Sequence, residues 1–219
     1  MMNKVAQVVG EKSYDVLFKF NIVGDSNVGK TAFTQSFING VFNDSTQTTI
    51  NVDISITEKQ ILDKHIRIQM WDTTGLERFR AIRKSYYNKS DGIILMYDTT
   101  CRESFDSILY WYFEIQQQAS EDVPIILVGS KTDLDDERVV SFQEGHIMAS
   151  RYKIPFMETS AKIMTSINVV IDVLANIVLE TKYPVRKESI KGQRPIIILS
   201  DSDMQQEQES KIDKKKCCN

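Results

Sequence analysis

The feature that most constrains the fold of this chain is a regular alternation of short apolar runs with longer amphipathic stretches. The short runs have the length of β-strands, and the longer stretches carry apolar residues at helical spacing. This alternation predicts βαβ units and a largely parallel sheet. The strands are expected at 16–23, 52–57, 66–71, 92–97, 125–129 and 154–158, and the helices at 31–37, 104–118, 142–152 and 165–180.

Two of the expected strands differ from the others. Residues 52–57 and 66–71 alternate apolar with polar side chains, and a turn around Lys64 joins them, so an antiparallel hairpin is expected. The whole pattern predicts an α/β fold, a six-stranded and mostly parallel sheet with helices on both faces. Roughly 165 residues are enough for one core of this kind.

Composition divides the chain into three parts. Residues 14–180 contain every expected strand and helix and form the predicted domain, with an N-terminal extension at 1–13. Residues 181–219 are rich in Lys, Arg, Ser, Gln, Glu and Asp, which is typical of a flexible tail. The apolar run at 195–199 within it is either a short strand or docking segment, or a patch in a disordered tail.

Charge and composition make several classes of function unexpected. The net charge of -3 and the pI near 5.5 give no basic stripe, so no nucleic-acid partner is expected. No run of eighteen or more apolar residues occurs, and no signal peptide is expected. Cys101 lies mid-chain, far from Cys217 and Cys218, and this layout indicates neither a disulfide framework nor a zinc site.

The strongest motif is Gly24-Asp25-Ser26-Asn27-Val28-Gly29-Lys30-Thr31, which lies between an expected strand and an expected helix. It matches G-x-x-x-x-G-K-[ST], whose glycines let backbone N–H groups turn inward around a phosphate. The helix N-terminus adds positive potential, Lys30 can reach the terminal phosphates, and the Thr31 hydroxyl can bind Mg²⁺. The alternative is a chance glycine turn before a helix.

A second motif, Trp71-Asp72-Thr73-Thr74-Gly75, follows the third expected strand. Asp72 is therefore expected at the carboxyl end of that strand, where its carboxylate can hold Mg²⁺ through water. Gly75 can present its backbone N–H to a third phosphate without a side chain in the way. Alone, the motif would be an ordinary turn.

Two further motifs follow the next strands, Ser130-Lys131-Thr132-Asp133 and Glu158-Thr159-Ser160-Ala161-Lys162. Each taken singly is a solvated loop by default. Together they are expected at the same edge of the sheet as the glycine-rich motif at 24–31, the phosphate loop. The Asp133 carboxylate can accept two hydrogen bonds from guanine, whereas adenine offers no matching pair of donors. The stem of Lys131 can cover one face of the base.

With all four motifs in order, the chain resembles the small GTPases of the Ras superfamily and, within it, the Rab family. The resemblance implies GTP or GDP and Mg²⁺ as ligands, with Thr49 as a further metal ligand and Phe42 packed edgewise on the guanine. It also implies catalytic roles at Lys30, Thr49, Gly75 and the position of Leu76. The implied nucleotide contacts are Asp25, Ser26, Asn27, Val28, Gly29, Lys30, Thr31, Ala32, Phe42, Thr49, Gly75, Ser130, Lys131, Asp133, Ser160, Ala161 and Lys162.

Four departures from the Rab-like pattern affect function. Leu76 stands where the family usually has the glutamine that orients the attacking water, and Thr74 replaces an alanine. Slow intrinsic hydrolysis is therefore expected, because leucine has no donor or acceptor. Ser130 replaces an asparagine that can bond both base and phosphate loop, a role that serine can partly fill. Asn51 replaces a glycine, which bears on effector choice.

The C-terminal Cys217-Cys218-Asn219 resembles the paired-cysteine ending on which Rab proteins receive two lipid groups. The alternative is two unmodified thiols. Two lipids anchor stably, and the lysines at 214–216 add attraction to anionic lipid. The resemblance implies a monomer on the cytoplasmic face of an endomembrane, cycling with the cytosol. Its implied partners are effectors, an exchange factor, a GTPase-activating protein, a prenyl-transfer escort and a GDP-dissociation inhibitor.

Three functions fit these motifs. The first is a lipid-anchored Rab-like switch that recruits effectors through a surface with Trp71, Tyr86 and Ile54. The second is a GTP-binding scaffold that hardly hydrolyses. The third is a phosphate-loop kinase or ATPase, against which Asp133 and the stretch after Glu158 argue. The nucleotide that co-purifies with the protein would separate them.

Overall fold

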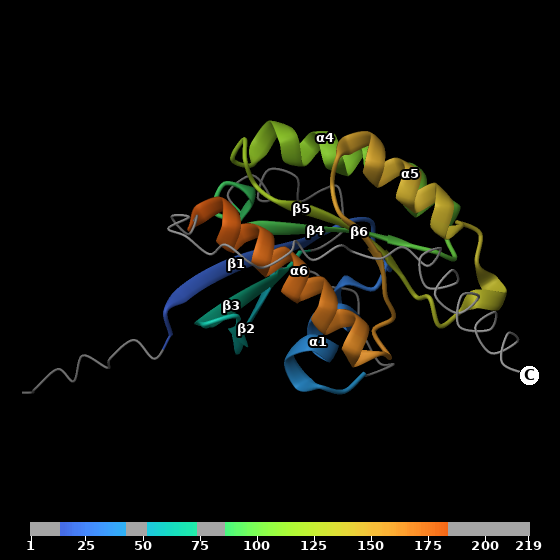
Figure 1. Ribbon diagram of the computed structural model, residues 1–219. Coiled ribbons are helices and arrows are strands. Elements are labelled where there is room, and N and C mark those ends of the chain that lie inside the picture. Colours follow the sequence, from blue (N-terminus) through green and yellow to red (C-terminus); the bar gives the residue numbers. More distant parts are fainter. Residues whose placement is uncertain (1–13, 43–51, 74–85, 184–219) are drawn as a thin grey trace, which may run out of the picture. The chain divides into compact units, whose positions relative to one another are not determined.

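The computed structural model of this 219-residue chain describes residues 14–42, 52–73 and 86–183. These residues belong to one compact unit, Met1–Pro184. Strands and helices alternate along it (Figure 1). The elements are β1 (Val16–Val23), α1 (Lys30–Asn39), β2 (Asp53–Ile61), β3 (Lys64–Asp72), β4 (Gly92–Asp98), α3 (Arg102–Asp106), α4 (Ile108–Gln118), β5 (Ile125–Ser130), a 3-10 turn η2 (Asp135–Glu137), α5 (Phe142–Tyr152), β6 (Phe156–Glu158) and α6 (Met164–Lys182).

Within the described residues, six strands form one sheet in the order β2-β3-β1-β4-β5-β6. β2 and β3 are antiparallel, with Ile54 opposite Trp71. The other neighbouring strands pair in parallel. The prediction of an α/β fold with a six-stranded, mostly parallel sheet is therefore confirmed.

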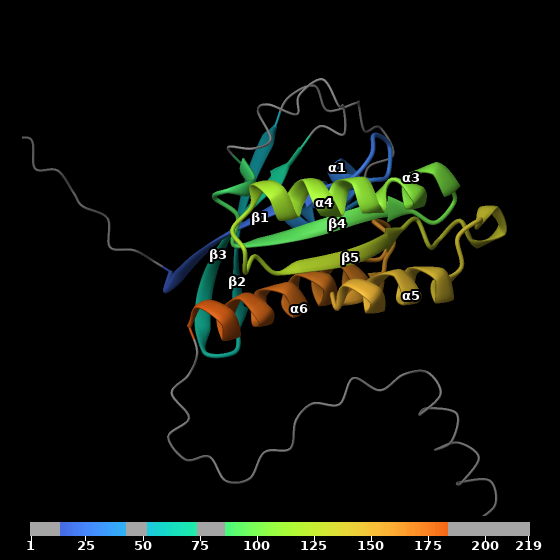
Figure 2. The ribbon, with the colours of Figure 1, turned by 90° about the horizontal axis from the view of Figure 1, so that it is seen from above.

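Helices cover both faces of the sheet (Figure 1 and Figure 2). On one face, Phe33 of α1 and Leu174 of α6 belong to the same apolar cluster as Phe20 of β1. On the other face, Trp111 of α4 belongs to a second cluster with Leu95 of β4. The alternation of side chains along each central strand supplies both clusters, because neighbouring residues point to opposite faces.

One helix in the described part of the chain, α6, is long and apolar enough to cross a membrane by length and composition. Its apolar face packs in the first core cluster, through Ile167, Val170, Ile171, Leu174, Ala175, Val178 and Leu179. Burial against the sheet thus accounts for the apolar composition of this helix.

Several element boundaries differ from the prediction, most clearly in the helix expected at 104–118, at the hairpin turn and at the start of β6. The expected helix at 104–118 is two helices that meet at Ser107, whose hydroxyl donates to the Glu103 carbonyl at 3.0 Å. The hairpin turn lies at residues 62–63, where Leu62 has φ 54°. β6 begins at Phe156 because Ile154 N–H bonds the end of α5, at the Ala149 carbonyl, and Pro155 has no N–H.

Candidate functional site

The described motif residues gather where parallel strands end. β3 ends at Asp72, opposite Ile22 of β1, and β5 ends at Ser130, opposite Asp98 of β4. The Thr73 hydroxyl donates to the Ile22 carbonyl at 2.6 Å and fixes the start of the second motif to β1. The loops that follow these strands therefore share one edge of the sheet, the usual position of a ligand site in this class of fold.

The phosphate loop connects β1 to α1 and bends through three residues with positive φ. Gly24 has φ 147°, and a Cβ on it would lie 2.1 Å from the Met96 carbonyl oxygen, so only glycine fits. Asn27 has φ 66° and Gly29 has φ 96°. No side chain caps the N-terminus of α1 at Gly29, so the first N–H groups of this helix face the loop.

Lys30, the first residue of α1, lies inside this loop. Its ammonium donates to the carbonyl oxygens of Gly24, at 2.9 Å, and Asp25, at 2.5 Å. The residue is 6% exposed, so water screens its charge little and the charge acts on the surrounding loop. A buried cation and a helix N-terminus together suit an anionic ligand such as a phosphate.

Two predicted metal ligands lie next to each other. The Thr31 hydroxyl donates to Asp72 Oδ2 at 2.6 Å, and Asp72 is 2% exposed. In the described part of the chain, no three His, Cys, Asp or Glu side chains form a metal cluster. A hydroxyl with one carboxylate fits Mg²⁺, which completes its oxygen shell with phosphates and water. Thr49, the third predicted ligand, lies outside the described residues.

The predicted base-binding residues come together from two loops. Asp133 accepts a hydrogen bond from the Ser160 hydroxyl at 2.6 Å and forms an ion pair with Lys162 at 2.8 Å. Desolvation opposes ionisation of Asp133, but hydrogen bonds from Lys162 and Ser160 outweigh it and lower the pKa of this carboxyl. The Lys162 ammonium also lies 5.5 Å from the ring centre of Phe42. Ala161 connects Ser160 to Lys162 in the same loop.

Ser130 links the predicted base-binding loop to the phosphate loop. Its hydroxyl oxygen lies 2.6 Å from the Val28 carbonyl and 2.8 Å from the Tyr97 carbonyl, both within hydrogen-bond distance. The side chain is buried, and its own carbonyl accepts from the Thr99 hydroxyl at 2.8 Å. Serine at this position therefore contacts the phosphate loop.

Lys131 has φ 61°, and its ammonium pairs with Asp98 at 2.6 Å. The same Asp98 carboxylate accepts from the Thr100 N–H at 2.8 Å and the Thr100 hydroxyl at 2.7 Å. This aspartate at the end of β4 thus directs the lysine stem. Its position after a buried strand was the available signal for the role, which the sequence analysis did not assign.

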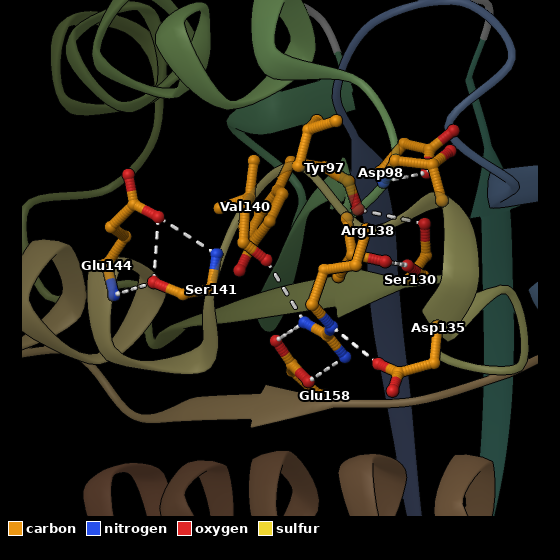
Figure 3. A network of polar contacts seen from close by, with 12 residues as sticks. Tyr97, Asp98, Ser130, Asp135, Arg138, Val140, Ser141, Glu144 and Glu158 are labelled. Atoms are coloured by element: carbon orange, nitrogen blue, oxygen red, sulfur yellow. Dashed lines mark hydrogen bonds and ion pairs between the residues drawn. The ribbon is translucent and has the colours of Figure 1, made fainter.

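Arg138 and Glu158 form a contact that the sequence analysis did not predict (Figure 3). The guanidinium donates to both Glu158 oxygens, at 2.8 and 2.9 Å, and to Asp135 at 2.9 Å. It also donates to the Val140 carbonyl at 3.1 Å. These bonds, above all those to Glu158, raise the pKa of Arg138. The contact joins the segment after Asp133 to the strand that precedes Ser160.

The remaining predicted residues divide into two groups. Trp71 and Tyr86 lie with ring centres 5.1 Å apart, and Ile54, opposite Trp71 in the hairpin, is 47% exposed. Trp71 and Ile54 thus lie on the hairpin of β2 and β3, and Tyr86 packs against Trp71. Outside the described residues are Asn51, Thr74, Gly75, Leu76, Cys217 and Cys218.

Comparison with known proteins finds one matching family model and many similar proteins. Residues 19–180 match the model of the Ras family. GTP-binding protein ypt2 of Schizosaccharomyces pombe is 44% identical over 158 residues, covering 72% of this chain and 78% of that protein. Ras-related protein Rab-8B of Pongo abelii is 44% identical over 156 residues, covering 71% and 75%. Ras-related protein Rab-10 of Caenorhabditis elegans is 41% identical over 171 residues, covering 78% and 85%.

Proposed function

Because this chain belongs to the Ras family of small GTPases, we propose that it is a Rab-like switch that recruits effectors in vesicle traffic when GTP is bound. Membership of the family implies hydrolysis of GTP to GDP and phosphate. The names of its relatives, Rab-8B and Rab-10 among them, favour the Rab branch. GTP, GDP and Mg²⁺ are its proposed ligands.

One observation carries the proposal: Asp133 forms a hydrogen bond with Ser160 and an ion pair with Lys162. Ser160 and Lys162 hold the Asp133 carboxylate at 2.6 and 2.8 Å, which favours its ionised form. An ionised carboxylate accepts two hydrogen bonds from the ring N–H and the amino group of guanine. Adenine offers no matching pair of donors, so the acceptor positions of this carboxylate that face the base would lose water without gaining hydrogen bonds. Guanine nucleotides are therefore the proposed ligands, which argues against a kinase or ATPase.

The phosphates are proposed to lie against Lys30 and the N-terminus of α1. Bound Mg²⁺ would neutralise charge between the phosphates, with Thr31 and Thr49 as ligands and Asp72 acting through water. The Lys30 ammonium, which has three N–H donors and contacts the Gly24 and Asp25 carbonyls, would direct at least one donor to a phosphate oxygen. The backbone N–H groups from Asp25 to Ala32 would complete the cradle.

The switch itself is proposed to depend on the third phosphate. Thr49 through the metal and Gly75 through its N–H would contact that phosphate, so the segments around both residues would be ordered by GTP and released after hydrolysis. Effectors would then bind the surface that Trp71, Tyr86 and Ile54 contribute. Asn51, which is close to Thr49 in the sequence and replaces a glycine usual in Rab proteins, is proposed to affect which effector binds.

Attachment to the cytoplasmic face of an endomembrane is proposed to involve lipids on Cys217 and Cys218. One lipid gives only reversible binding, whereas two give stable anchoring. The residues at 181–219 would act as the tail between the domain at 14–180 and the membrane. The proposed partners are an exchange factor, a GTPase-activating protein, a prenyl-transfer escort and a GDP-dissociation inhibitor, each bound by a monomeric chain.

A second candidate is a GTP-binding scaffold that hardly hydrolyses, which Leu76 favours. The nucleotide that co-purifies with the full chain distinguishes the candidates. GDP supports a working hydrolase, GTP supports the scaffold, and adenine nucleotides contradict both.

Competition binding tests the base site itself. Asp133→Asn exchanges an acceptor for a donor and is expected to weaken GTP binding at least about tenfold, since a lost hydrogen bond to a charged group costs about 1.5–3 kcal/mol. Asp136→Asn makes the same chemical change in an exposed position of the same loop and is the matched control. If ATP competes equally with GTP for the unmodified protein, the base site is assigned wrongly.

A further inference from the structure

Asp25 places a negative charge in a loop that is proposed to hold phosphates. Like charges at short range repel, and the effect is strongest where water is scarce. The structure provides a partner for this carboxylate, because the indole Nε1 of Trp111 donates to Asp25 Oδ1 at 2.6 Å. The two residues are 86 positions apart in the sequence. The bond therefore joins the phosphate loop to α4.

Trp111 is fixed in place by its surroundings. It is 2% exposed and lies in the core cluster between α4 and the sheet, together with Ile108 and Ile115 of the same helix. An indole N–H is only a donor, so a buried tryptophan requires an acceptor. The packed ring thus presents a single N–H in a fixed direction, toward the phosphate loop.

Asp25 is also held through its backbone. Its carbonyl oxygen accepts from the Lys30 ammonium, while its side chain accepts from Trp111. The peptide group therefore faces the buried cation of the loop, and the carboxylate faces the helix. A carboxylate without the indole donor would be free to rotate toward the same cation and compete there with phosphate oxygens.

We infer that Trp111 is a positioning residue for nucleotide binding, whose indole N–H holds the Asp25 carboxylate against α4 and away from the phosphates. The inference rests on the proposed binding of guanine nucleotides. It assigns Trp111 an electrostatic role toward the ligand, in addition to its packing in the core. A purely structural tryptophan would lack that role.

Dissociation rates of labelled GDP and GTP from the full chain test the inference. Trp111→Phe keeps a buried aromatic ring but removes the donor, and is expected to speed nucleotide dissociation about tenfold. The effect should be larger for GTP, which carries more charge, and smaller at high salt. Adding Asp25→Asn to Trp111→Phe should restore the rate to within about threefold of the unmodified protein, because a neutral amide does not repel phosphate.

Phe113→Leu is the matched control, because it removes an exposed aromatic ring from the same helix. It should leave both dissociation rates unchanged. Equal acceleration of GDP and GTP by Trp111→Phe, with no rescue by Asp25→Asn, would show a packing role only and overturn the inference.

A second measurement does not require Trp111→Phe to fold. The indole N–H resonance of Trp111 in the full chain is expected to shift upfield on Asp25→Ala, because the hydrogen bond to a carboxylate is lost. Trp71→Phe assigns the two indole resonances, and that of Trp71 is the internal control. An unchanged Trp111 resonance contradicts the inference. This measurement needs no nucleotide, so its failure is distinct from failure of the unmodified protein to bind GDP or GTP.

Discussion

At the scale of single residues, two buried tyrosines have opposite environments. Tyr87 and Tyr97 are both 0% exposed. The Tyr87 hydroxyl donates to Glu114 Oε1 at 3.3 Å. The Tyr97 hydroxyl has no hydrogen-bond partner among the described residues, and burial, with the nearby charge of Glu158, raises its pKa. A phenol without a partner is expected to cost stability, whereas one with a partner is expected to contribute.

Replacing each tyrosine with phenylalanine tests this difference. Tyr97→Phe removes an unpaired polar group and is expected to increase the free energy of unfolding by about 1 kcal/mol. Tyr87→Phe leaves a buried glutamate with one donor fewer and is expected to decrease it by about 1–3 kcal/mol. Urea unfolding of both variants, with equal nucleotide content, measures the two changes. A loss of stability in Tyr97→Phe would mean that an ordered water satisfies the hydroxyl.

At the scale of secondary structure, the glycine in α5 reverses an ordinary rule. Alanine in a helix is usually more stable than glycine by about 1 kcal/mol. A Cβ on Gly145, however, would lie 2.3 Å from Phe156 Cζ and 2.5 Å from the Tyr97 hydroxyl. Overpacking of this kind costs about 1–3 kcal/mol, so Gly145→Ala is expected to destabilise the protein. Thermal unfolding checks the sign, and adding Tyr97→Phe should recover part of the loss because it removes the hydroxyl at 2.5 Å, while the contact with Phe156 remains.

The contacts of Glu144 at the start of α5 predict that the stability of the folded protein depends on pH. Glu144 pairs with Arg102 at 2.8 Å and forms a capping box with Ser141. These contacts, the hydrogen bond from Arg102 first, lower the pKa of Glu144 from 4.5 to about 2. A lowered folded-state pKa means that the stabilisation is complete above about pH 4.5 and is lost as the pH falls toward 2.

Glu144→Gln keeps a capping oxygen but removes the charge. The variant should be less stable than the unmodified protein at pH 7, and the difference should shrink between pH 4.5 and 2. Urea midpoints across this range measure it. Glu137→Gln, an exposed change outside the helix, is the control and should show no such convergence. A difference that stays constant with pH would contradict the assignment.

The elements themselves were predictable, because their signals are local. Helix α5 begins and ends where predicted, at Phe142 and Tyr152, since its apolar spacing and Ser141 are both visible in the sequence. The start of β6 was predicted two residues too early, because the bond from Ile154 N–H to the end of α5 depends on the folded loop. Periodicity cannot detect such competition at an element boundary.

Within the site, motifs predicted residues that meet after folding, such as Thr31 with Asp72. Contacts from residues outside motifs were not predictable. Arg138 lies in an irregular loop, and nothing in its spacing indicates that it pairs with Glu158. Trp111 has the periodicity of a core residue, and this pattern carries no information about its bond to Asp25. The sequence thus indicates which chemistry is present, whereas the fold decides which side chains hold it in place.

At the scale of the whole molecule, the loops around the site have different supports. Arg138 joins the segment after Asp133 to the strand before Ser160, and Ser130 joins the first of the two proposed base-binding loops to the phosphate loop. Trp111 joins the phosphate loop to α4. The proposed base and phosphate sites are therefore connected to the same core. None of these three contacts uses Leu76, so nucleotide binding should survive a change at this proposed catalytic position.

Leu76 provides the sharpest test of that separation between binding and catalysis. Phosphoryl transfer through a loose transition state relies on the positioning of water and on charge stabilisation. Leucine has no donor or acceptor with which to hold water. Leu76→Gln is therefore expected to raise the intrinsic rate of GTP hydrolysis by about tenfold or more, with unchanged nucleotide affinity. Single-turnover hydrolysis of the unmodified chain, Leu76→Gln, and Leu76→Gln with Thr74→Ala measures this effect.

Comparison of the unmodified chain with the single and the double variant separates the role of Leu76 from that of Thr74. A large rise only in the double variant would identify Thr74 as the principal block, through crowding near the third phosphate or a competing hydroxyl. Equal rates in all three would contradict slow hydrolysis caused by either residue. A GTPase-activating protein that supplies its own arginine and glutamine would raise the rate of the unmodified chain, because both groups then come from the partner. Slow intrinsic turnover is thus compatible with a working switch, provided that hydrolysis is controlled by the partner.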